Sequence, residues 1–169
     1  QGGIAHRPVV GMVQGNIVDD PCGWIVGDEY IWFVQTDLAR QVGSVLGNEL
    51  SAMGFNLFLG PSLDVLESPE STLGNKLGAG VFGGDPFWVS RLGQAYITGL
   101  HAGSTTENGT GSRMAVIAKH FPGMGSSDRN PQTEIPTVRK SLDQLKRIEL
   151  APFYSVTGGS AQPEAIADG

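Results

Sequence analysis

Two short segments hold most of the side chains that could bind or transform a ligand. The first, GPSLDV, contains Asp64, and the second, KHFPGMGSSDRN, opens with Lys119 and His120. Each follows a short apolar run typical of a buried parallel strand, at 55–59 and 114–118. The carboxyl ends of parallel strands meet at one edge of a sheet, where binding sites form. An ammonium group and an imidazole at that edge suit an anion or a ligand rich in hydroxyl groups, and a carboxylate there can accept hydrogen bonds from hydroxyl groups.

The same three residues also fit roles that involve no ligand. His120 can cap a backbone carbonyl, Lys119 can pair with a nearby carboxylate, and an aspartate such as Asp64 often forms a turn or caps a helix. If Asp64 and Lys119 face each other across neighbouring strand ends, the pair is either a salt bridge or half of a polar binding site. The residue types alone leave both interpretations open.

The elements that must position these residues alternate along the chain. Apolar residues at three- and four-residue spacing predict a helix over 37–53, with Asp37 as its N-cap and Gly54 as its stop. The strand at 55–59 should then break at Gly60 and Pro61. A second helix is expected to begin at the Asp85–Pro86 pair and run to about residue 100.

A third helix is predicted after the second strand. It begins near Ser141, has Gln144 at capping-box spacing, and should bury Leu142, Leu145 and Ile148. Pro152 should end or bend it, and residues 165–167 are expected to open one more strand. The alternation of buried strands and amphipathic helices predicts an α/β fold with a parallel sheet over 37–169. Residues 1–36 form an N-terminal segment without a clear assignment, in which two glycine-interrupted strands are the nearest interpretation.

Composition excludes several classes of partner. The 169 residues carry a net charge of −6 and their basic residues are scattered, which argues against nucleic acid. No apolar run approaches the ~20 residues of a membrane helix. The glycine-rich stretches lack the lysine of a phosphate loop and the full dinucleotide pattern. We therefore expect no membrane span, no cofactor and no metal; the compartment stays open, with the cell surface or exterior among the options.

The motifs resemble a known family of enzymes. KHFPGMG, followed by IPTVRKSLDQLKRIELAPF, closely resembles the middle of the N-terminal barrel domain of glycoside hydrolase family 3, in its β-N-acetylglucosaminidase-like branch. ELSAMGFNLFLGPSLDV and GAGVFGGDPFWVSRLGQAYITGL are similar to its preceding segments. The resemblance runs collinearly from about residue 38 to residue 153.

This resemblance implies a TIM-type (β/α) barrel and a retaining hydrolysis of O-glycosyl bonds in β-linked N-acetylglucosaminides or β-glucosides. By position, Asp64, Lys119 and His120 would hold hydroxyl groups of the sugar, and none of them is the nucleophile. A closed barrel typically takes ~250 residues, so about half of one is expected here, with the remainder supplied by the same or another chain. The alternatives are a carbohydrate-binding relative without catalysis and a structural or assembly protein that reuses the half-barrel.

Several positions depart from the family pattern. Gly80 stands where the family has a sugar-binding arginine, and Gln132 stands where the branch has the histidine that acts as acid and base. Glutamine cannot transfer a proton, so Asp128 and Glu134, close to the loop, are the candidate substitutes. The family's nucleophilic aspartate lies on a later strand, and the context of Asp168 does not match it.

Overall fold

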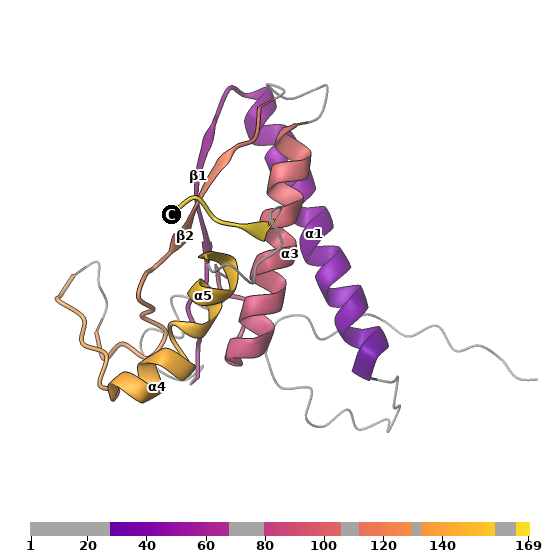
Figure 1. Ribbon diagram of the computed structural model, residues 1–169. Helices are drawn as coiled ribbons and strands as arrows, with labels where there is room; N and C mark the ends of the chain where they lie inside the picture. The colour runs from indigo at the N-terminus through magenta and orange to yellow at the C-terminus, as the bar shows by residue number, and fades with distance from the viewer. Residues whose placement is uncertain (1–27, 68–79, 106–111, 130–132, 158–164) are drawn as a thin grey trace, which may run out of the picture.

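A computed structural model describes residues 28–67, 80–105, 112–129, 133–157 and 165–169. The elements follow in the order α1 (Asp28–Ala52), β1 (Leu57–Ser62), α3 (Pro86–Ser104), β2 (Ala115–Lys119), α4 (Leu142–Arg147) and α5 (Ala151–Thr157). Figure 1 shows β1 and β2 side by side, with α1 and α3 together on one side of them. The strands pair in parallel, with Phe58 opposite Val116. The predicted α/β arrangement with a parallel sheet is confirmed.

The prediction for the start of α1 was wrong. The helix begins at Asp28, upstream of the expected N-cap Asp37, so residues 28–36 are helical instead of extended. Asp37 accepts hydrogen bonds from the side chains of Arg40 and Gln41, one helical turn further on. These hydrogen bonds, of which the one from Arg40 has the largest effect, hold the pKa of Asp37 below its ordinary value. A carboxylate satisfied along the helix surface has no need to cap a helix end.

Helices α1 and α3 approach each other through small residues. On α1 the buried positions Ala39, Gly43, Gly47 and Ser51 recur every four residues, which places them on one face. A Cβ added at Gly99 of α3 would lie 2.0 Å from the carbonyl oxygen of Arg40. Several large apolar residues that the spacing predicted to pack inward are exposed in the described chain: Leu38, Val42, Val45 and Met53. Close contact between the two backbones therefore replaces the expected packing of large side chains.

Strand β1 does not end where the glycine and proline suggested. It continues through Gly60 and Pro61, whose peptide bond is cis, to Ser62, and the pairing with β2 is irregular between Leu59 and Ser62. The strand is extended by one more hydrogen bond, from the N–H of Leu63 to the carbonyl of Lys119. Proline is tolerated at an irregularity of a sheet because no ladder hydrogen bond is required from it there.

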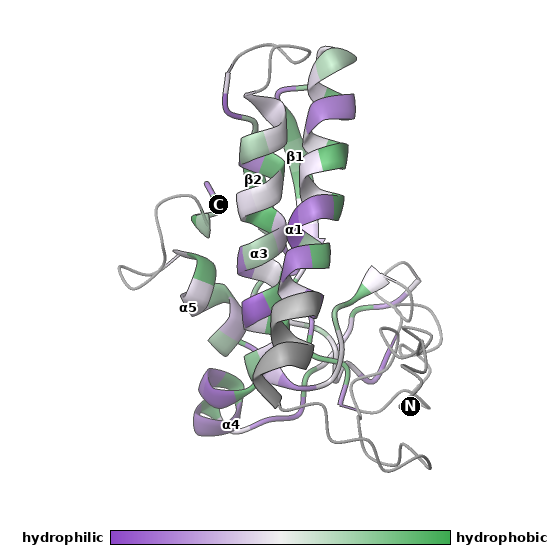
Figure 2. Cartoon of the chain, turned by 90° about the vertical axis from the view of Figure 1, so that its right-hand side faces the viewer, coloured by the Kyte–Doolittle hydropathy of each residue, from purple (hydrophilic) through white to green (hydrophobic). Residues whose placement is uncertain are grey.

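The two faces of the strands differ in burial. Phe58 packs against the core, and Val116 belongs to it, together with Ile97 and Leu100 of α3. Leu57 and Leu59, on the opposite face of β1, are 47% and 63% exposed, so the expectation of a strand buried on both faces is met on one face only. Figure 2 shows α1 and α3 covering the buried face of the two strands.

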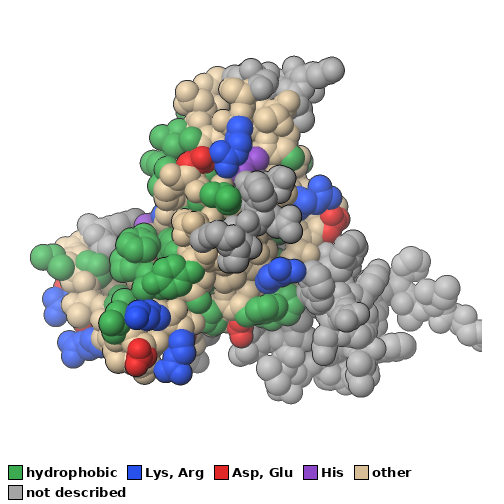
Figure 3. All heavy atoms as spheres, viewed as in Figure 1, with side chains coloured by type: hydrophobic (Ala, Val, Ile, Leu, Met, Phe, Trp, Pro, Cys, Tyr) green, Lys and Arg blue, Asp and Glu red, His purple; other side chains and the backbone are tan. Residues whose placement is uncertain are grey.

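Helix α4 begins as predicted and packs differently. Ser141 and Gln144 form the expected capping box. None of its residues is buried, and Leu142 is 63% exposed, because the helix is only six residues long. The core residues of this region lie instead in α5, which contributes Phe153 and Val156. Pro152 lies in the first turn of α5. Figure 3 shows hydrophobic side chains gathered on the face that carries α4 and α5.

The last residues lie against β2. No strand is assigned at 165–167, but Asp168 N–H donates to the carbonyl of Val116, and the carbonyl of Gly169 accepts from Ala118 N–H. The Asp168 carboxylate accepts hydrogen bonds from Arg113 Nη1 and from Val116 N–H. Burial raises the pKa of Asp168, but the hydrogen bonds from Val116 and Arg113, with the nearby His101, hold it below its ordinary value. In the described part of the chain, no helix is long and apolar enough to cross a membrane.

Candidate functional site

Asp64 is the centre of a hydrogen-bonded cluster at the carboxyl ends of the strands. It lies two residues beyond the end of β1 and its side chain is completely buried. Its Oδ2 atom accepts from Ser62 Oγ at 2.7 Å and contacts His120 Nδ1 at 2.6 Å. Its Oδ1 atom accepts from the N–H of Met124 at 2.9 Å. Three donors from two strand ends therefore meet on one buried carboxylate.

His120 is positioned by this carboxylate. It follows the last residue of β2 through a cis peptide bond, and its side chain is 39% exposed. A carboxylate oxygen only accepts, so the short contact with Asp64 places a hydrogen on Nδ1. The other ring nitrogen, Nε2, makes no hydrogen bond with the residues that the structure describes. The imidazole is thus fixed at one nitrogen and available at the other.

Lys119 lies beside this pair but does not form the salt bridge with Asp64 that was one of the two expected interpretations. Asp64 is paired with His120, so the salt bridge considered between Asp64 and Lys119 is not formed. The carbonyl of Lys119 accepts from Leu63 N–H at 2.6 Å, which joins the two strand ends. Its half-buried side chain makes no ion pair with the described residues. The ammonium group therefore remains available to a ligand.

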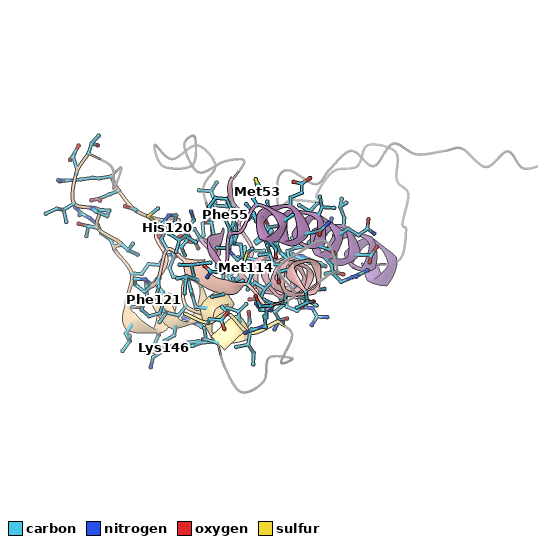
Figure 4. The ribbon with its side chains drawn as sticks, turned by 90° about the horizontal axis from the view of Figure 1, so that it is seen from above. Met53, Phe55, Met114, His120, Phe121 and Lys146 are labelled. Carbon is cyan, nitrogen blue, oxygen red and sulfur yellow. The ribbon has the colours of Figure 1, made fainter. Side chains whose placement is uncertain are left out.

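The loop after β2 carries two of the three donors to Asp64, His120 and Met124. It contains a second cis bond, Phe121–Pro122, and Gly123 has a φ of 114°, which other residues rarely adopt. Gly123 N–H donates to the carbonyl of His120, closing a tight turn. A Cβ at Gly125 would lie 2.0 Å from the carbonyl oxygen of Val65. These glycines let the loop approach the first strand end closely enough for Met124 to reach Asp64. Figure 4 shows His120 and Phe121 to the left of α1 and α3.

The candidate acid–base residues belong to the next part of the loop. Asp128 accepts from Thr137 N–H at 3.0 Å and pairs with Arg139 at 3.6 Å. Glu134 is exposed and pairs with Arg129 at 3.3 Å. Neither contacts Asp64, Lys119 or His120, so the structure does not bring them into the cluster.

Other predicted positions contribute less. Gly80 is exposed, with nothing within 4 Å of an added Cβ, and Gln132 lies outside the described residues. Asp168 lies near the start of β2, away from the cluster at the strand's other end. Among the described residues, no group of three or more His, Cys, Asp or Glu side chains is arranged to hold a metal ion.

Sequence reasoning missed two of the donors in the cluster. Ser62 and the backbone N–H of Met124 both bind Asp64. Ser62 is two residues from Asp64 on the same strand end, and this spacing is the signal that could have found it. The contact of Met124 has no sequence signal, because it depends on the path of the loop.

Comparison with known proteins places this geometry in a family. The family model of the "Glycosyl hydrolase family 3 N terminal domain" matches residues 33–163, most of the chain. The chain belongs to glycoside hydrolase family 3. The N-terminal domain of this family is a TIM-like (β/α) barrel, and the α/β elements of this chain are part of one. The predicted family and fold are confirmed.

Similar proteins agree with this family assignment. A beta-hexosaminidase of Pseudomonas aeruginosa is 31% identical over 122 residues, which cover 72% of this chain and 33% of that protein. A beta-hexosaminidase of Neisseria gonorrhoeae is 36% identical over 115 residues, covering 68% of this chain and 28% of the relative. The chain thus spans about a third of the length of these family 3 proteins.

Solved family 3 structures show the same arrangement of elements. A β-N-acetylglucosaminidase from Paenibacillus sp. str. FPU-7 aligns with a TM-score of 0.61 at 32% identity, over 71% of this chain and 20% of that one. NagZ from Neisseria gonorrhoeae aligns with a TM-score of 0.60 at 32% identity, over 78% and 34%. In such a barrel the strand face opposite the helices points to the barrel interior, which accounts for the apolar Leu57 and Leu59 on that face of β1.

Proposed function

We propose that the whole protein hydrolyses O-glycosyl bonds of β-linked N-acetylglucosaminides or β-glucosides, with retention of configuration. The observation that carries this proposal is the His120–Asp64 pair, held at the carboxyl ends of parallel strands of a family 3 barrel. The active sites of such barrels lie at this end of the strands. The names of the relatives, beta-hexosaminidase and β-N-acetylglucosaminidase, favour the N-acetylated sugar.

In this proposal His120 and Lys119 contact the sugar, and Asp64 orients His120. The exposed Nε2 of His120 and the Nζ of Lys119 offer polar atoms to hydroxyl groups. Asp64 was expected to hold a hydroxyl itself, and this stays a prediction. Its complete burial and its three donors favour an indirect role, in which it fixes the ring of His120.

The proton donor remains a choice between two carboxylates of this chain. Asp128 has one oxygen committed to the backbone of Thr137, whereas Glu134 has only an exposed ion pair with Arg129. A general acid needs a carboxyl group that can reach the leaving oxygen, so Glu134 is the freer candidate. Full activity of Glu134→Gln would exclude it, and full activity of Asp128→Asn would exclude the other.

Turnover of synthetic glycosides tests the function. The whole protein should release the aryl group from an aryl N-acetyl-β-glucosaminide or an aryl β-glucoside. His120→Ala should lower kcat/KM by about 10- to 100-fold, as loss of a hydrogen bond to the transition state does. Lys146→Ala, an exposed cation of α4, serves as the matched control and should leave kcat/KM unchanged. Tight sugar binding without turnover would favour a carbohydrate-binding relative, and absence of both would favour an assembly role.

A further inference from the structure

A second buried carboxylate lies on the other side of the loop that carries His120. Glu149, between α4 and α5, is completely buried. Its Oε1 atom accepts from Ser126 Oγ at 2.6 Å and from Lys140 Nζ at 2.9 Å. A Cβ added at Gly123 would lie only 2.6 Å from the Oε2 atom of Glu149. Glu149 therefore contacts the loop at two points, Ser126 and Gly123.

The cation that accompanies Glu149 links it to the first strand end. Lys140 is 10% exposed and also pairs with Glu67, a partly exposed carboxylate three residues beyond Asp64. One ammonium group thus joins the segment after β1 to the segment between α4 and α5. The loop after β2 passes between these segments, with Asp64 holding Met124 and Glu149 holding Ser126.

A simple contribution to stability does not account for this arrangement. Removing a carboxylate from water is costly, and apolar residues of similar size often give equal or greater stability. In addition, Glu149 Oε2 is buried without a hydrogen-bond partner among the described residues. Unsatisfied buried groups are uncommon in native proteins, and each calls for an explanation. Residues 120–127 have neither helix nor strand, so their position depends on such side-chain acceptors.

We propose that Glu149 is a positioning residue of the sugar site, which fixes the 120–127 loop through Ser126 so that His120 and Met124 meet Asp64. The inference rests on the proposed function for its effect on sugar turnover. Its structural part, the hold of Glu149 on the loop, stands apart from that function. Two readouts are therefore needed, one of the loop and one of the reaction.

The experiment compares Ser126→Ala and Glu149→Gln with the control Glu67→Gln in the whole protein. Glu67 pairs with the same lysine but does not contact the loop. Hydrogen–deuterium exchange of residues 120–127 reports the loop, and kcat/KM for the aryl glycoside reports the reaction. Ser126→Ala and Glu149→Gln should each raise exchange of the loop and lower kcat/KM by about tenfold, the effect of one lost charge-assisted hydrogen bond. Glu67→Gln should stay within about twofold of the wild type.

A double-mutant cycle separates positioning from general destabilisation. If Glu149 acts through His120, then Glu149→Gln should lower kcat/KM by less than about twofold when His120 is already alanine. A full tenfold loss in that background would overturn the proposal, as would unchanged loop exchange in Ser126→Ala. If Glu149→Gln does not fold, Ser126→Ala carries the same test. If the wild type turns over no glycoside, the proposed function fails, and loop exchange alone then decides whether Glu149 holds the loop.

Discussion

Replacing Asp64 tests the central contact of the site. Asp64→Ala removes the acceptor of three hydrogen bonds, from Ser62 Oγ, His120 Nδ1 and Met124 N–H. Asp64→Asn keeps the size of the side chain and one oxygen. In the asparagine variant the remaining oxygen can still accept from Met124, and the new amide can donate to Ser62 and to His120 if the imidazole moves its hydrogen to Nε2.

The two variants should differ in stability. A hydrogen bond to a charged group contributes about 1.5–3 kcal/mol, and removing one partner of a buried charged pair costs about 3–5 kcal/mol. The side chain of Asp64 is fully buried, but that of His120 is 39% exposed and can bind water instead. We therefore expect Asp64→Ala to lower the free energy of unfolding by about 3–5 kcal/mol, because the three contributions do not add. Asp64→Asn should cost about 1–2 kcal/mol, since its hydrogen bonds can be remade.

Urea unfolding of the whole protein measures this difference, and ¹⁵N NMR of labelled histidine reports which ring nitrogen carries the hydrogen. Asp143→Ala, which removes an exposed carboxylate of α4, is the control. In Asp64→Asn, the hydrogen of His120 should move from Nδ1 to Nε2. Equal and small losses of stability for the alanine and asparagine variants would contradict this prediction, because a buried acceptor of three donors cannot be removed at no cost.

Three further predictions concern the scaffold. Gly99→Ala would place a Cβ 2.0 Å from a backbone carbonyl of α1, and should destabilise by about 1–3 kcal/mol in urea unfolding; Gly80→Ala, with open space around it, should not. The pKa of Asp168 is lowered in the folded protein, so its stabilising effect is complete above its ordinary pKa of 3.8 and is lost as the pH falls through the lowered value. Asp168→Asn should therefore weaken the fall in stability between pH 5 and pH 2, as measured by urea unfolding at each pH. Ser141→Ala removes the N-cap of α4 and should cost about 1 kcal/mol by the same measurement, and the cost should persist in a Gln144→Ala variant because Ser141 Oγ accepts from the backbone N–H of Gln144.

Local signals predicted the elements that depend on neighbouring residues. Asp85 caps α3 by accepting from the N–H groups of Phe87 and Trp88, and Ser141 caps α4 with Gln144. Both are interactions within four residues, so their pattern is visible in the sequence. The start of α1 at Asp28 was not predicted, because the residues before Asp37 were interpreted as glycine-interrupted strands. The glycines at four-residue spacing on α1 and α3 were visible, but their role depends on which helices are neighbours in space.

The site was predicted as far as strand order could place it. Asp64 and His120 follow the ends of paired parallel strands, and this alone brings them to one edge of the sheet. Which of Lys119 and His120 pairs with Asp64 depends on the register at the strand ends, and the irregularity beyond Leu59 changes that register. The part played by Glu149 depends on four segments that meet only in the folded chain, so no spacing reveals it.

The two buried carboxylates also explain how a loop without regular structure can hold a precise site. Backbone groups in helices and strands satisfy one another, whereas in residues 120–127 only some do so, as Gly123 N–H does with the carbonyl of His120 and Ser127 N–H with that of Met124, and the others need partners from elsewhere. Asp64 supplies an acceptor for Met124 N–H on one side, and Glu149 supplies one for the side-chain hydroxyl of Ser126 on the other. Because these two loop residues are only two positions apart, a shift at one carboxylate must change the geometry at the other. Variants of Asp64 and Glu149 should therefore be non-additive in stability and, under the proposed function, in kcat/KM for an aryl glycoside, even though the two carboxylates make no contact with each other.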